Sequence, residues 1–66
     1  MTRVKIKTIS GRDYYETTNI TFDNYIEIFS KYPIPFIYVK DEFDNEVWVK
    51  TDAIEAITLI KESEDD

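Results

Sequence analysis

The sequence predicts an α+β fold in which one helix packs across one face of an antiparallel sheet, with the elements in the order ββαβββ. Three observations predict it. Residues 3–9 alternate charged and apolar side chains, residues 22–32 carry apolar side chains at helical spacing, and residues 36–61 return to short alternating runs. Runs of strands interrupted by one helix are typical of α+β proteins rather than of parallel βαβ units.

The first hairpin is predicted from residues 3–18. The segment Arg-Val-Lys-Ile-Lys at residues 3–7 places its two apolar side chains on one face and its three cations on the other, which is the alternation of a half-buried strand. The turn at residues 10–13 contains the chain's single glycine, Gly11, which is free to adopt a positive φ. The aromatic and β-branched run at residues 14–18 then favours a second strand.

The helix has predicted boundaries at both ends. Thr21 is expected to cap its N-terminus, and Asp23 in the first turn suits the positive end of the helix dipole. The helix is expected to end near Tyr32, because Pro33 and Pro35 disfavour helical geometry in the residues before them.

The apolar side chains of this helix fall in one continuous arc at about 100° per residue. We expect the centre of the arc to lie over the sheet, and it consists of Phe22, Ile26 and Phe29. One rim of the arc consists of Tyr25, Ile28 and Tyr32. Tyrosines beside carboxylates at such a rim have the composition of an interface, although the edge of the core is an equally good interpretation.

A second hairpin is predicted from residues 36–41 and 47–50. A two-residue loop at 44–45 would pair Val39 with Lys50 and mix apolar and charged side chains on one face. A three-residue loop at 43–45 is favoured instead, because it pairs apolar residues with one another.

Three further expectations follow from this favoured register. Val39 pairs with Val49, Lys40 lies opposite Trp48 as a cation–π pair, and the last loop residue, Asn45, takes the left-handed conformation that asparagine tolerates. Residues 51–55 are then expected to form a capped single turn, and residues 56–61 a final strand. Residues 1–61 are thus expected to form one domain, followed by an acidic disordered tail at 62–66.

The inventory of side chains argues against an enzyme. The 66 residues include no histidine and no cysteine, so the usual general base, zinc ligands and disulfides are missing, and we expect no cofactor. The segment 41–46 is rich in carboxylates, but Phe43 occupies a position where a calcium loop needs an oxygen ligand. We expect no metal site there. The N-terminal segment lacks the apolar run of a signal peptide, and no stretch is long enough to span a bilayer, so the cytoplasm is the expected location.

Charge is distributed unevenly along the chain. Residues 1–12 carry four bases and no acid, which gives +4, and residues 13–66 carry four bases and all fourteen acids, which gives −10 and a net charge of −6. An acidic field of this kind disfavours direct binding to nucleic acid and favours a basic or DNA-binding protein as the partner. A role in solubility alone is the simpler interpretation of the same acidity.

The segment Gly-Arg-Asp-Tyr-Tyr-Glu at residues 11–16, followed by Ile-Thr-Phe-Asp at 20–23 and an aromatic helix, resembles the small acidic Bacillus-phage inhibitors of uracil-DNA glycosylase. The resemblance covers about residues 4–40. It implies a ββαβ fold, a dimer, and inhibition by mimicry of DNA in the enzyme's binding cleft. This chain continues beyond the family's third strand, and the added strands would cover an edge used by the dimer.

By position, the resemblance implies partner contacts at Glu16, Tyr25 and Phe29. The family's glutamate after its helix phenylalanine falls on Ile26, where neighbouring Glu27 would have to substitute. Together with the helix rim and the acidic hairpin tip, the candidate partner-binding residues are Glu16, Tyr25, Glu27, Phe29, Tyr32, Asp41, Glu42, Asp44 and Glu46.

The sequence therefore favours a small acidic protein-binding module, in which carboxylates replace phosphates and aromatic rings fill an apolar groove. One alternative is a self-assembling protein that forms a homodimer through an edge strand or the helix rim. A weaker alternative is nucleic-acid binding through the basic first strand, with Trp48 stacking on bases. No membrane partner is expected.

Overall fold

The computed structural model describes residues 1–62, which form five β-strands, one α-helix and one turn of 3-10 helix. In chain order these elements are β1 (Thr2–Thr8), β2 (Asp13–Thr18), α1 (Phe22–Lys31), β3 (Phe36–Lys40), β4 (Glu46–Lys50), η1 (Thr51–Ala53) and β5 (Ile54–Glu62). Glu62 belongs to β5, one residue beyond the expected end of the domain, and the rest of the expected acidic tail lies outside the described residues.

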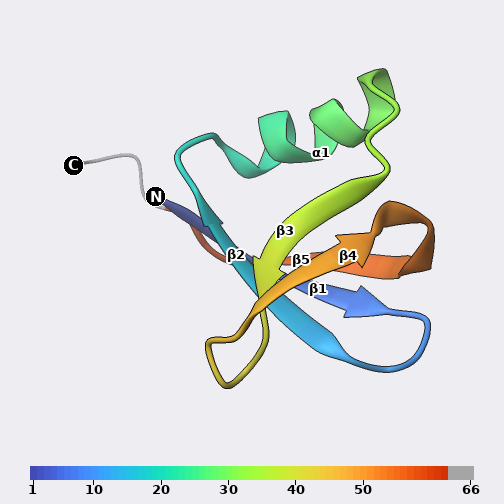
Figure 1. Ribbon diagram of the computed structural model, residues 1–66. Helices are drawn as coiled ribbons and strands as arrows, with labels where there is room; N and C mark the ends of the chain where they lie inside the picture. The colour runs from blue at the N-terminus through green and yellow to red at the C-terminus, as the bar shows by residue number, and fades with distance from the viewer. Residues whose placement is uncertain (63–66) are drawn as a thin grey trace.

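The strands form one antiparallel sheet in the order β4-β3-β2-β1-β5, and α1 crosses one of its faces (Figure 1). The predicted α+β class and the order ββαβββ are confirmed. Extents of 34 × 30 × 17 Å describe a flat, two-layered molecule. Within residues 1–62, β4 and β5 lie at opposite ends of the strand order and do not pair with each other.

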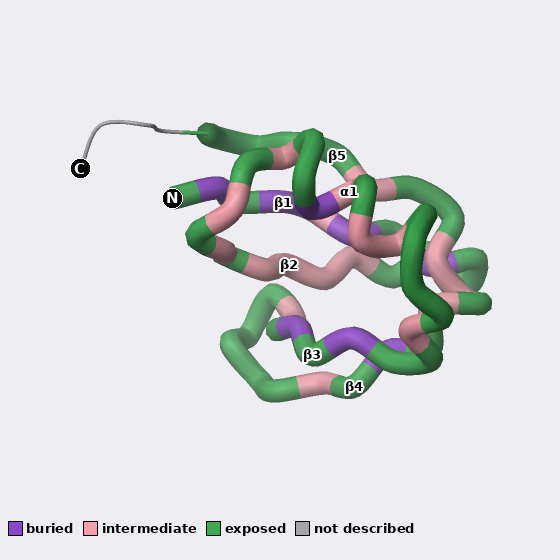
Figure 2. The backbone as a smooth tube through the Cα atoms, turned by 90° about the horizontal axis from the view of Figure 1, so that it is seen from above, coloured by how far each residue is buried: buried purple, intermediate pink, exposed green. Residues whose placement is uncertain are grey.

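The central part of the core is built on β1. Its alternate residues Thr2, Val4, Ile6 and Thr8 are buried on the helix side, whereas the residues between them point to the other face. Val4 and Ile6 are fully inaccessible, and Ile37, Val39 and Val49 complete the buried face from β3 and β4. Figure 2 follows this burial along each strand, and the predicted alternation of residues 3–7 is confirmed.

The helix begins and ends where the sequence predicts. The Oγ1 of Thr21 accepts a hydrogen bond from the backbone N–H of Asn24 at 3.2 Å, which satisfies one of the free donors of the first turn. At the other end, the N–H of Tyr32 donates to the carbonyl of Ile28, and Tyr32 itself has an extended backbone.

The rotation of the helix differs from the prediction. Tyr25 is its buried residue, at 5% exposure, and not a rim residue, while Phe22, Ile26 and Phe29 are half-buried around it. The reason is that a tyrosine ring can be buried when its hydroxyl finds a hydrogen-bond partner, and the hydroxyl of Tyr25 reaches Glu16 on β2. The spacing of residues within the helix could not predict this burial, because Glu16 lies outside the helix.

The predicted register of the second hairpin is wrong. Val39 pairs with Val47, not Val49, and Lys40 pairs with Glu46, which leaves a five-residue loop at 41–45. Val39 and Val49 still share the buried face, because both registers preserve the alternation. The loop is longer than expected because the Asp41 side chain supplies hydrogen bonds to its backbone, as described below.

The shifted register changes the neighbours of Trp48. Tyr38 lies opposite Trp48, with ring centroids 5.4 Å apart, and Lys40 forms an ion pair with Asp44 at 3.4 Å instead of lying over the indole. Asp44, rather than Asn45, takes the left-handed conformation, at φ 68°.

The single turn before β5 is not capped by a side chain, contrary to the prediction. Thr51 instead donates its hydroxyl to the carbonyl of Ile34 at 2.5 Å and its N–H to the carbonyl of Pro35. These bonds attach η1 to the segment that leads from α1 into β3. The turn therefore fixes where the chain enters β5.

Candidate binding surfaces

The nine predicted partner-binding residues do not form one surface. Four of them lie on or just after α1, and four lie on or beside the β3–β4 loop, away from the helix (Figure 1). Glu16 on β2 lies between the two groups, because it accepts a hydrogen bond from Tyr25 and lines a cleft with Asp41 and Asp44. The loop group consists of Asp41, Glu42, Asp44 and Glu46. A partner that covered both groups would have to span the sheet.

Glu16, Tyr25 and Phe29 are brought together, but as part of the interior. The Tyr25 hydroxyl donates to Oε1 of Glu16 at 2.5 Å, and the Tyr25 and Phe29 rings meet edge to face with centroids 5.2 Å apart. Burial, together with the hydrogen bond to Glu16, raises the pKa of Tyr25 well above its ordinary value. These three side chains are already engaged with one another, so their first role is packing.

Glu27 and Tyr32 remain on the outside of the helix. Glu27 forms an ion pair with Lys31 at 3.1 Å, and both side chains are more than half exposed. Tyr32 is 61% exposed and lines a groove of about 580 Å³ with Phe29, Ile34 and Ile57. Exposed i,i+4 pairs of this kind contribute little to stability.

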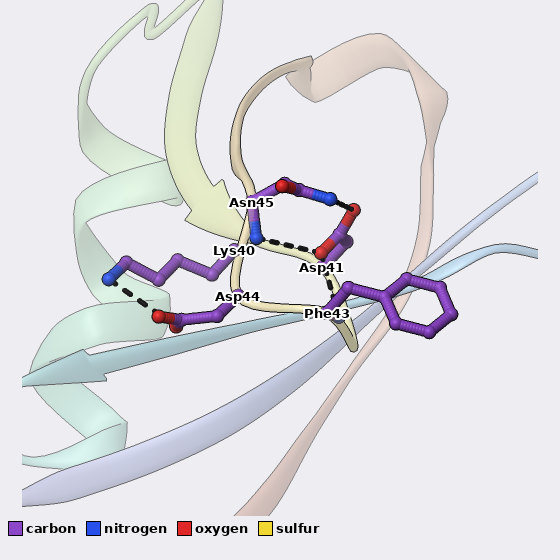
Figure 3. Close-up of polar contacts among 5 residues, drawn as sticks. All are labelled: Lys40, Asp41, Phe43, Asp44 and Asn45. Carbon is purple, nitrogen blue, oxygen red and sulfur yellow. Dashed lines mark hydrogen bonds and ion pairs between the residues drawn. The ribbon is translucent and has the colours of Figure 1, made fainter.

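The β3–β4 loop is organised by one carboxylate. Oδ1 of Asp41 accepts from the backbone N–H groups of Phe43 at 2.8 Å and Asn45 at 2.9 Å, and Oδ2 accepts from the Asn45 amide at 3.0 Å (Figure 3). These bonds from Asn45 and Phe43, with the nearby charge of Arg12, hold the pKa of Asp41 below its ordinary value. The loop is therefore a closed turn whose shape depends on an ionised aspartate.

Because Asp41 faces inward over its own loop, its neighbours face outward. Phe43 is 76% exposed, the highest exposure among the large apolar side chains that the structure describes, and Glu42 beside it is exposed as well. Figure 3 shows the Phe43 ring pointing away from the loop. The sequence-based candidate set omitted Phe43, although its position between acidic residues was a signal for an exposed aromatic side chain.

A second exposed surface lies on the face of the sheet that α1 leaves open. Tyr38 and Trp48 are neighbours there, at 41% and 67% exposure, and the guanidinium of Arg3 lies 5.2 Å from the centroid of the Tyr15 ring. The candidate partner-binding set left these four residues out, and only Trp48 and the basic first strand were considered, for the weaker nucleic-acid alternative. Their alternation with the buried residues of the same strands was the available signal.

No family model, curated protein or solved structure matches this chain. Among residues 1–62, no group of three or more acidic side chains is arranged to hold a metal ion. The helix of the described chain is also too short and too polar to cross a membrane.

Proposed function

We propose that this chain is a non-catalytic protein-binding module, and that its loop at residues 41–46 binds a basic site on a DNA-binding protein. The observation that carries the proposal is the fixed loop geometry, in which three hydrogen bonds to Asp41 leave the Phe43 ring outside. An aromatic side chain on a preorganised loop loses little conformational entropy on binding, which is the property of an interface hot spot.

The charges around Phe43 support a basic partner. In the sequence, Phe43 lies among the acidic residues Glu42, Asp44 and Glu46. Of these three, only Asp44 forms an ion pair with a lysine in the described part of the chain. Carboxylates at this spacing attract a site that binds phosphates, while the ring enters an apolar recess between its cations. A loop that occupies the DNA-binding cleft of its partner in this way would inhibit that partner by excluding DNA.

The resemblance to the phage inhibitors of uracil-DNA glycosylase makes that enzyme the first target to test. The contacts that the resemblance implies at Glu16, Tyr25 and Phe29 do not support it, because these side chains pack against one another. The outer edge of β3 is covered by β4, so the family's dimer is not part of the proposal. The acidic loop carries it instead.

The test is a titration of the purified chain into a uracil-excision assay, with Phe43→Ala as the test variant and Ile9→Ala as the matched control. Ile9 is also strongly exposed, at 73%, but it lies outside the acidic loop. We expect inhibition by the parent chain and the control, and a loss of roughly tenfold or more with Phe43→Ala. Full enzyme activity at large molar excess of the parent chain would remove uracil-DNA glycosylase as the target.

If this enzyme is not inhibited, the class of partner is tested with a lysate fraction that binds heparin, because heparin retains DNA-binding proteins. The parent chain and Ile9→Ala are expected to retain a protein that Phe43→Ala and Glu42→Gln release. Equal retention by all four chains would contradict a role for the loop.

Self-association through β5 is a second candidate function, supported by a separate observation. β5 is an edge strand, and its apolar residues Leu59 and Ile60 are 39% and 47% exposed. Exposed apolar edges favour pairing with a second copy. Light scattering tests this, and Ile60→Lys is expected to shift a dimer to a monomer.

A further inference from the structure

The sheet face without the helix collects most of the chain's cations. The alternation of each strand places Arg3, Lys5 and Lys7 of β1 on this face, because the residues between them are buried against α1. The strand registers add Lys40, Lys50 and Lys61, whereas the carboxylates on the same face are Asp13 and Glu46. Asp44 lies beside them and forms an ion pair with Lys40. A chain with a net charge of −6 therefore has one locally cationic face.

Aromatic rings lie between these cations. Tyr15 pairs with Lys5 on one side and with Lys40 on the other, so the register gives a row in which a ring separates two ammonium groups. In the neighbouring hairpin Tyr38 lies opposite Trp48 on the same face. Trp48 is 67% exposed, so its indole is available to an external group.

A cleft of about 350 Å³ opens on this surface between β2 and β3. The two strands pair at Tyr15 and Lys40, and the opening beside this pair is lined by Arg3, Tyr15, Thr17, Tyr38 and Lys40, with Glu16, Val39, Asp41 and Asp44 completing the wall. Its volume falls in the range of small-ligand pockets. Tyrosine faces, hydroxyls and cations are the groups that bind a nucleobase and its phosphate.

We propose that this helix-free face binds single-stranded nucleic acid, with one base in the cleft between Tyr15 and Tyr38 and a neighbouring base stacked on Trp48. Arg3, Lys5 and Lys40 lie on the face where they would contact the phosphates that connect these bases, and Lys40 would exchange its ion pair with Asp44 for a phosphate. The proposal goes beyond the protein-binding loop at 41–46 and uses different side chains, so either can fail without the other.

The form of nucleic acid follows from the shape and charge of this face. Bases inside a duplex are stacked on one another and cannot lie on side chains, so the aromatic rings select a single strand. The remaining acidic field of the protein opposes a long polyanion, which favours a short segment of a few nucleotides. Contacts from three cations to a single strand give a slope of about −2 for log affinity against log salt.

The test uses the intrinsic fluorescence of Trp48, which is the only tryptophan in the chain. The full chain is titrated with a 12-nucleotide oligo(dT) at low salt and, separately, with a duplex of the same length. We expect saturable quenching by the single strand and none by the duplex. Anisotropy of a labelled oligo(dT) then measures the variants, including Trp48→Ala.

Three variants and a control separate the contributions. Tyr38→Ala and Trp48→Ala are expected to weaken binding by roughly tenfold each, because each removes one stacking surface. Arg3→Gln is expected to weaken binding and to reduce the magnitude of the salt slope by about 0.7. Lys31→Gln changes the same charge on the helix and is expected to leave the affinity unchanged. Both Arg3 and Trp48 are exposed, so these substitutions do not depend on the core.

Any of three results would overturn the proposal. The first is the absence of quenching at millimolar nucleotide, and the second is an equal loss of affinity with Lys31→Gln. The third is competition by polyglutamate as strong as that by oligo(dT), which would mean that the face recognises negative charge alone, as on an acidic protein. Circular dichroism of each variant confirms that the fold is retained.

Discussion

The hydroxyl of Tyr25 donates a hydrogen bond to the carboxylate of Glu16 at 2.5 Å, and this contact joins the buried residue of α1 to the second strand of the sheet. It brings together two positions that sequence resemblance assigned to a protein partner. In the folded chain they are partners of each other.

Tyr25→Phe is expected to lower the free energy of unfolding by about 1–2 kcal/mol, because it leaves the half-buried Glu16 carboxylate without its donor. Urea denaturation measures the change. Tyr32→Phe is the matched control, since it removes the same hydroxyl from a tyrosine that is 61% exposed. Equal stability of the two variants would show that the Glu16 contact contributes nothing.

Alkaline pH is expected to destabilise the parent chain more than Tyr25→Phe. Burial and the Glu16 hydrogen bond raise the pKa of Tyr25 in the folded state, so only the unfolded state releases this proton near its ordinary pKa of about 10. The stabilising contribution is therefore complete below about pH 10 and is lost as the pH rises further. Urea midpoints at a series of pH values test this, and parallel curves for the two proteins would contradict it.

Asp41→Ala is expected to loosen the 41–45 loop without unfolding the sheet. The substitution removes the acceptor of the Phe43 and Asn45 backbone N–H groups, so both amides should exchange with solvent faster. Asp44→Asn is the control, because it removes the charge that pairs with Lys40 while asparagine tolerates the left-handed backbone at this position. Hydrogen exchange followed by NMR gives both rates, and unchanged protection in Asp41→Ala would argue against a loop organised by this carboxylate.

Gly11→Ala is expected to cost about 1 kcal/mol of stability through the backbone alone. Gly11 has a φ of +90°, and an added Cβ would meet nothing within 4 Å, so no clash contributes. Gly11→Asn should cost less, because asparagine tolerates positive φ better than alanine does. Thermal denaturation of both variants measures this order, and the reverse order would contradict a purely conformational cause.

Thr21→Ala is expected to cost about 1 kcal/mol, because the N–H of Asn24 loses the Oγ1 acceptor that caps the helix. Thr21→Asp restores an acceptor and adds a charge favourable to the helix dipole, so its stability should return to that of the parent chain. Urea denaturation of the pair provides the comparison. A similar loss in both variants would mean that the threonine methyl group, rather than the cap, is responsible.

Local signals in the sequence were sufficient to predict those elements whose ends depend on residues close by in the chain. The alternation of residues 3–7, the glycine turn and the capped helix before Pro33 each depend on neighbours within a few positions. These elements were predicted correctly because the backbone geometry and the burial of one face depend on residues only a few positions apart in the chain.

The hairpin register was not decided by such signals. Two registers that differ by two residues keep Val39 and Val49 on the same buried face, so alternation cannot separate them. The choice was made by the Asp41 side chain, which closes a five-residue loop. An aspartate at the start of the loop is a signal for the longer loop, but the sequence alone does not show which of the two registers is more stable.

By itself the sequence determined the α+β class, the order of the elements, the limits of the helix and the chain's overall negative charge. The tertiary structure decided which of its aromatic rings are buried and where its cations gather. Tyr25 is enclosed because α1 packs on a cluster of buried residues from β1, β3 and β4, whereas Trp48 is exposed because it lies on the face of the sheet that α1 leaves open. Contacts between distant residues depend on the packing of whole elements, which no short stretch of sequence contains.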